Sequence, residues 1–281
     1  MNEEKKITQI DIDAIIGSKN PRLLKLLPGF VLNYIKKILH QEDVNLFLRN
    51  HHSEMGLDFV RSIISEFNIT VSSSGLENLP ATGGCILASN HPLGGLDAIP
   101  LMNEVSKVRT DMKFLVNDIL MNLENLGPVF VPINKHGKNA AESVRRIAET
   151  YASDQCTMIF PAGLVSRRQG SIFGGKTKVI RDLEWHKSFI TQSVKNRRNV
   201  IPVFIEALNS PFFYNFAFWR KKLGIPVNLE MFFLVNEMYK QRNKSIRIIF
   251  GEAIPFATFT KDRTDREWAN EVKTLVYALK K

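Results

Sequence analysis

The chain has 281 residues, of which 44% are hydrophobic and 23% are charged. It is therefore long enough for one large α/β domain or two small ones, and too apolar to be disordered. The net charge of +10 favours nucleic acid, an anionic membrane or an acidic ligand as partner. Zinc-ligand spacings, RNP-like aromatic motifs and helix-turn-helix signals are all missing from the sequence, so we expect no nucleic-acid partner.

Residues 1–67 predict an N-terminal helical region, and within it residues 30–40 form the best helix. Its apolar stripe at helical spacing consists of Val31, Tyr34, Ile35 and Ile38. Lysines flank this stripe, which suits a helix lying on an anionic membrane. Packing of the stripe against the rest of the chain is the alternative, and both remain open.

The start of the chain, residues 1–13, is charged and lacks the apolar core of a signal peptide. No apolar stretch reaches the roughly 18 residues that are needed to span a bilayer. We therefore expect a cytoplasmic protein that associates peripherally with the inner face of the cell membrane.

Residues 68–281 predict a second region in which strands alternate with helices. The expected strands are 85–89, 112–116, 128–131, 156–160, 199–204 and 245–250, and the expected helices include 55–67, 98–105, 180–194 and 264–280. This alternation predicts an α/β fold with a mainly parallel twisted sheet flanked by helices. The two cysteines, Cys85 and Cys156, lie in apolar strand-like runs and are expected to be buried thiols in a reducing compartment.

A histidine and an aspartate share a glycine-rich turn that follows the apolar strand 85–89. In open α/β sheets, ligands bind at the carboxyl ends of strands, which is where this turn lies. The His91 imidazole can take a proton from a hydroxyl, and the Asp97 carboxylate can orient the ring and stabilise the imidazolium. Gly94 and Gly95 let the backbone bend back and leave room for a substrate. The alternative is an ordinary tight turn with a solvated aspartate.

This turn, with Asn90 before His91, resembles the first motif of the lysophospholipid acyltransferase superfamily, also called glycerolipid acyltransferase-like. Three later segments resemble its second, third and fourth motifs in the same order: residues 127–131, 160–163 and 200–203. Within the superfamily, the chain looks most like a bacterial subgroup of haemolysin-like proteins that includes aminolipid O-acyltransferases. The resemblance implies that His91 is the general base and that Asp97 orients it, although five residues separate the two here and four in many members.

The resemblance also implies the substrates. The acyl donor is expected to be a thioester of acyl carrier protein or coenzyme A, with no separate cofactor and no metal. Asp182, Glu184 and His186 lie at spacings of two, which do not share one helical face, so they predict no metal site. The motif residues that we expect to contact the substrates are Asn90, Gly94, Gly95, Pro161 and Gly163.

Three positions depart from the motifs and bear on the acceptor. Ile133 and Val165 occupy positions where the family commonly has arginines that are thought to hold a glycerol phosphate, and Ala162 replaces a glutamate. Apolar side chains cannot make the bidentate contacts that a phosphate needs. The cations near the motifs that can bind the donor's phosphates or an acceptor carboxylate are Lys135, His136, Arg167 and Arg168, with solvated surface charge as the alternative.

Residues 211–219 are unusually aromatic and are followed by three basic residues. This pattern is typical of a membrane interface, and an aromatic core helix is the alternative. Taken together, the sequence predicts an O-acyltransferase that acts on a lyso-lipid at the membrane surface, with a lyso-aminolipid of the N-acyl glycine or ornithine type as acceptor. The alternatives are acylation of lysophosphatidic acid, lipid hydrolysis, for which no Gly-x-Ser-x-Gly motif is present, and a basic membrane-binding protein without activity.

Overall fold

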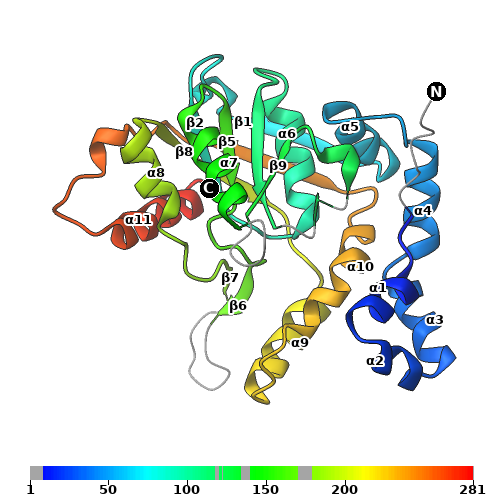
Figure 1. The fold of residues 1–281 in the computed structure, drawn as a ribbon. Coiled ribbons are helices and arrows are strands. Elements are labelled where there is room, and N and C mark those ends of the chain that lie inside the picture. The colour runs from blue at the N-terminus through cyan, green and yellow to red at the C-terminus, as the bar shows by residue number, and fades with distance from the viewer. Residues whose placement is uncertain (1–8, 118–119, 122, 134–139, 170–178, 281) are drawn as a thin grey trace.

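The computed structural model describes residues 9–117, 120–121, 123–133, 140–169 and 179–280, and a seven-stranded sheet forms the centre of this part of the chain (Figure 1). In spatial order the strands are β1 (Thr70–Ser74), β9 (Ser245–Phe250), β8 (Asn199–Glu206), β2 (Cys85–Ser89), β5 (Cys156–Ile159), β3 (Met112–Val116) and β4 (Phe130–Pro132). Neighbouring strands pair in parallel except β8 and β9, which are antiparallel. The predicted mainly parallel sheet is confirmed.

Helices cover both faces of this sheet, which explains why its central strands are apolar on both sides. Along β2, Cys85 and Leu87 enter one core while Ile86 and Ala88 enter the other. The first core lies under α5 (Leu57–Glu66) and α6 (Ala98–Val105), and the second lies under α7 (Ala140–Ala152), α8 (Ser188–Asn196) and α11 (Asp265–Ala278). Cys85 pairs in register with Cys156, and both are buried free thiols as predicted.

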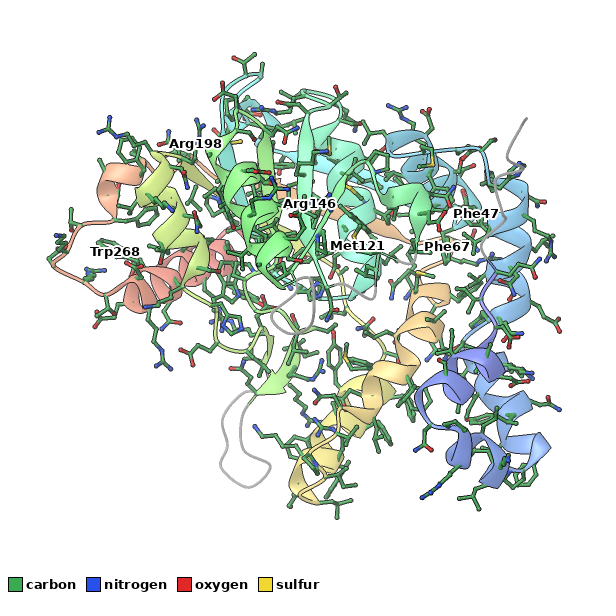
Figure 2. All side chains as sticks on the ribbon, in the orientation of Figure 1. Phe47, Phe67, Met121, Arg146, Arg198 and Trp268 are labelled. Atoms are coloured by element: carbon green, nitrogen blue, oxygen red, sulfur yellow. The ribbon has the colours of Figure 1, made fainter. Side chains whose placement is uncertain are left out.

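The N-terminal helices lie at the side of the molecule opposite α11, as the positions of Phe47 on α4 and Trp268 on α11 show (Figures 1 and 2). They are α1 (Ile12–Lys19), α2 (Pro21–Leu26), α3 (Gly29–Ile38) and α4 (Gln41–Asn50). They attach to α10 (Leu234–Tyr239) through His40, whose ring stacks on Tyr239 with centroids 3.8 Å apart and bonds Asn236 Oδ1 at 3.1 Å. No residue of α3 is buried, and Tyr34 of its apolar stripe is 60% exposed.

The predicted helix over residues 180–194 is wrong in its first half. Residues Val179–Arg181 form β7, which pairs antiparallel with β6 (Arg167–Gln169), and α8 begins at Ser188. The reason is tertiary: the Asp182 backbone amide donates to Tyr277 Oη, and its carbonyl accepts from Lys273 Nζ. These bonds replace those that a helix would make there.

The aromatic run forms α9 (Pro211–Lys222), which extends with the β6–β7 hairpin from the carboxyl edge of the sheet (Figure 1). Phe213 and Tyr214 are buried against the protein, whereas Phe212 and Trp219 are about half exposed. The helix is therefore apolar on its inner face and also presents aromatic side chains to solvent. In the described residues, no helix is both long and apolar enough to cross a bilayer.

Candidate active site

His91 and Asp97 face each other across the turn that follows β2. The His91 Nδ1 lies 3.0 Å from Asp97 Oδ2, and the same oxygen accepts the backbone amides of Leu93 at 2.9 Å and Gly94 at 3.0 Å. A short 3-10 turn at Gly95–Asp97 carries the aspartate back toward the ring. The extra residue in this motif is therefore absorbed within the turn, and the pair meets at hydrogen-bonding distance.

The surroundings of Asp97 determine how the histidine can act. The Asp97 side chain is fully buried, and burial raises the pKa of its carboxyl, whereas the bonds from His91 and the two amides lower it. An ionised carboxylate only accepts hydrogen bonds, so Nδ1 must carry the proton and Nε2 the lone pair. The His91 side chain is 15% exposed, and Nε2 has no hydrogen-bond partner among the described residues. This is the arrangement of a general base that is oriented by a carboxylate.

The plane of the imidazole is fixed by an aromatic neighbour. The ring stacks on Phe160, with centroids 4.2 Å apart and planes 18° apart. Phe160 directly follows β5, the strand next to β2 in the sheet. The carboxyl ends of two neighbouring parallel strands thus bring the first and third sequence motifs together.

The backbone of His91 is held at both of its polar groups. Its amide donates to Asp182 Oδ1 at 3.2 Å, and its carbonyl accepts the Ser166 amide at 2.7 Å. The Ser166 hydroxyl also donates to Asp182 Oδ1, at 2.5 Å, and Trp185 Nε1 donates to Asp182 Oδ2 at 2.9 Å. Asp182 is fully buried and was missed as a site residue from the sequence, because its partner is 91 positions away and no local pattern marks it.

Asn90 and the two glycines shape the turn in different ways. Both ends of the Asn90 side-chain amide bond the backbone of Ile205 on β8, so this residue braces the two strands and is 2% exposed. Gly94 has φ +93°, and a Cβ there would meet Leu234 and Val165 at 3.2 and 3.3 Å. A Cβ on Gly95 would meet nothing within 4 Å, so open space lies beside this residue.

The third-motif loop lies beside this turn. Gly163 is exposed, has φ +63° and donates its amide to the carbonyl of Phe160, and Pro161 is buried with its carbonyl accepting the His186 amide. Ala162 belongs to the second core, and Val165 is fully buried. The positions that depart from the family pattern are therefore apolar inside the folded protein as well.

A family model described as acyltransferase matches residues 14–281. The chain belongs to this acyltransferase family. The lyso-glycine lipid O-acyltransferase of Bacteroides thetaiotaomicron is 43% identical over 271 residues, which cover 96% of this chain and 97% of that protein. The protein of the same name from Phocaeicola vulgatus is 42% identical over 271 residues, which cover 96% of this chain and 95% of that protein. The solved 1-acyl-sn-glycerophosphate acyltransferase of Thermotoga maritima is 17% identical, with a TM-score of 0.47 over 95% of this chain and 93% of that one.

These matches confirm the predicted superfamily and the prediction that the protein is an enzyme that transfers acyl groups.

The four cations that the sequence analysis proposed as ligand-binding residues of this acyltransferase fall into three groups. Lys135 and His136 lie outside the described residues. The Arg167 guanidinium is buried and pairs with Glu230 at 2.9 Å, so it has a carboxylate partner within the protein. Arg168 is half-buried and donates to the neutral Asn215 Oδ1 at 2.6 Å, which makes it the better placed of the two arginines to meet a ligand.

Proposed function

We propose that this enzyme moves a fatty acyl chain from a thioester to the hydroxyl of a lyso-aminolipid of the lyso-glycine lipid type. The observation that carries this proposal is the His91–Asp97 pair, which leaves Nε2 accessible as a base at the carboxyl edge of the sheet. The names of the two relatives that match nearly the whole chain support the acceptor.

In the proposed reaction, one proton moves from the acceptor hydroxyl to His91 and then to the leaving group. As the acceptor hydroxyl attacks the thioester carbonyl carbon, its proton passes to His91 Nε2, and the imidazolium is stabilised by Asp97. When the tetrahedral intermediate collapses, the carbon–sulfur bond breaks and Nε2 returns the proton to the departing sulfur. The products are an ester of the lipid and the free thiol of the carrier.

Apolar side chains in the second and third motifs favour an acceptor with little charge. A phosphomonoester carries nearly two negative charges and needs several charge-assisted hydrogen bonds once it leaves water. Val165 is fully buried and Ile133 packs against the second core, so neither position can supply one. A lyso-glycine lipid has a single carboxylate and needs fewer partners.

Exposed apolar and basic side chains near the carboxyl edge support peripheral binding to an anionic membrane at the cytoplasmic face. The large exposed hydrophobic residues on α2, α3 and α9 and just after α9 are Leu26, Phe30, Tyr34, Phe212, Trp219 and Leu223. The last turn of α9 adds the exposed cations Lys221 and Lys222. Apolar side chains beside cations are typical of helices at the surface of an anionic bilayer.

The test is an assay of the purified enzyme with a lyso-glycine lipid and with lysophosphatidic acid, each with acyl carrier protein and coenzyme A thioesters. We expect a higher kcat/KM for the lyso-glycine lipid, and a loss of about 100-fold to 10,000-fold in His91→Ala with the fold intact. The acceptor assignment is falsified if lysophosphatidic acid is the better substrate. A folded His91→Ala protein with near-native transfer would contradict the mechanism.

A further inference from the structure

A cavity of about 930 Å³ lies between α9 and the start of the β6–β7 hairpin. One wall comes from the chain after the third motif and includes Leu164, Arg167 and Arg168, and the other comes from the second half of α9 and the loop that follows it. These two elements lie side by side below the sheet in Figure 1.

Two arginines in the cavity wall share one carboxylate. Glu230 is fully buried, and its Oε1 lies 2.9 Å from Arg167 Nη2 while its Oε2 lies 2.7 Å from Arg220 Nε. Burial lowers the pKa of the Arg167 guanidinium, Glu230 raises it, and the like charge of Arg220 lowers it again. Two guanidinium groups on one carboxylate leave a net positive charge that is held rigidly in place.

Two further cations of the cavity wall, Arg168 and Lys221, have no carboxylate partner among the described residues. The Arg168 guanidinium donates to Asn215 Oδ1 and lies 5.6 Å from the centroid of the Phe218 ring. Lys221 is exposed on the last turn of α9. The cavity wall therefore carries more positive than negative charge, and it suits a ligand with a phosphate.

The cavity is connected to the active site through the backbone. Arg167 directly follows Ser166, whose amide bonds the carbonyl of His91 at 2.7 Å. The described residues that line the cavity do not include His91 or Asp97. A ligand bound here thus holds its anionic group outside the His91–Asp97 turn, on the segment that follows the third motif. This suits the acyl donor, because the phosphate of a carrier-bound thioester is separated from the sulfur by the flexible pantetheine arm.

We propose that this cavity, lined by Arg167, Arg168, Arg220 and Lys221, binds the phosphate of the phosphopantetheine arm of the acyl donor. Acyl carrier protein and coenzyme A share this group, so either donor can present it. The inference rests on the proposed acyl transfer and extends it by assigning a binding site to the donor.

The test compares two small donors that differ by one phosphate, acyl-phosphopantetheine and acyl-pantetheine, with a lyso-glycine lipid in neutral detergent micelles. We expect the wild-type kcat/KM to be about tenfold higher for the phosphorylated donor, which corresponds to one charge-assisted contact. In Arg168→Ala and in Lys221→Ala this ratio should fall toward one, and in Arg168→Lys it should fall less. The matched control is Lys195→Ala, which removes an exposed lysine from the last turn of α8, a helix that contributes no residue to the cavity lining, and should keep the ratio.

Three results would overturn the inference. The first is a wild-type enzyme that uses both donors equally. The second is a variant that keeps the ratio but raises the KM of the acceptor, since the cavity would then bind the acceptor carboxylate. The third is a variant that keeps the ratio and loses only binding to anionic vesicles, since its cations would then face the membrane. Parallel assays with acyl carrier protein and coenzyme A thioesters show which natural donor loses more in the variants.

The same assay separates this inference from the proposed function. If the wild-type enzyme acylates the lyso-glycine lipid from acyl-pantetheine, the proposed transfer holds whatever the phosphate ratio is. If it acylates the lyso-glycine lipid from none of the four donors, the proposed function fails.

Discussion

The backbone amide of His91 donates to the Oδ1 atom of Asp182 at 3.2 Å. Through this bond a second buried carboxylate, besides that of Asp97, acts on the histidine. The same oxygen accepts the Ser166 hydroxyl, and Ser166 in turn bonds the His91 carbonyl. Asp182 thus fixes His91, the proposed general base, relative to the third-motif loop, and we regard it as a positioning residue.

Asp182→Asn should lower kcat by about tenfold and change the KM values less. In an asparagine, an amino group that only donates replaces one of the two accepting carboxylate oxygens. This amino group would face either the Trp185 N–H or the Ser166 hydroxyl and the His91 amide, all of which are donors themselves. A buried donor left unpaired costs about 1–3 kcal/mol in the free energy of unfolding. Steady-state kinetics and thermal unfolding measure both effects.

Trp185→Phe is the matched control for Asp182→Asn. It removes the indole donor to Asp182 and leaves the bonds from His91 and Ser166 possible. A purely structural role predicts that both variants lose stability and keep kcat. Positioning predicts that kcat falls in Asp182→Asn well beyond its fall in Trp185→Phe.

Sequence patterns were sufficient where the relevant contacts are local. The His91–Asp97 turn lies within one short motif, and the buried strands are marked by their own apolar runs, so both were predicted. The Asp182 anchor and the Arg167–Glu230 pair join residues that are far apart in the chain, 91 and 63 positions. Periodicity suggests a helix around Asp182, but its amide donates to Tyr277 Oη and its carbonyl accepts from Lys273 Nζ, and these tertiary bonds hold this segment in a non-helical form.

The stability of the protein should depend on pH through Asp97. Burial raises the pKa of this carboxyl in the folded protein above its unfolded value, which is about 3.9. The stabilisation from such a group is complete below the unfolded pKa and is lost as the pH rises through the folded pKa. Relative to Asp97→Asn, which cannot ionise, the wild-type protein should therefore lose stability as the pH rises from about 4 toward neutrality.

Melting temperatures of both proteins across this pH range test the expectation for Asp97. Repeating the comparison in a His91→Ala background removes the imidazole and its bond to Asp97. The pH dependence should then be larger, because the bond from His91 lowers the pKa of Asp97. A melting-temperature difference that does not vary with pH would contradict the assignment.

Binding to anionic vesicles should weaken as salt rises, because surface charges are screened. Trp219 on α9 is 53% exposed, whereas Trp185 and Trp268 are buried, so it serves as the reporter. We expect a blue shift of its fluorescence with anionic vesicles at low salt and a smaller shift at high salt. Equal shifts with neutral vesicles, or a shift that survives in Trp219→Phe, would argue against docking through α9.

The two neighbouring glycines of the His91–Asp97 turn should respond differently to replacement by alanine. Gly94→Ala should lower the free energy of unfolding by about 1–3 kcal/mol, because φ is +93° and the new Cβ would press on Leu234 and Val165. Gly95→Ala should leave the melting temperature nearly unchanged, since a Cβ there meets nothing within 4 Å. If the open space beside Gly95 receives the acceptor, the added methyl group should raise the acceptor KM without raising the donor KM. Thermal unfolding of this matched pair measures the two changes in stability, and two-substrate kinetics measure the KM values of acceptor and donor. A Gly95→Ala enzyme with both KM values unchanged would remove Gly95 from the acceptor site, and a Gly94→Ala protein as stable as wild type would contradict the described turn.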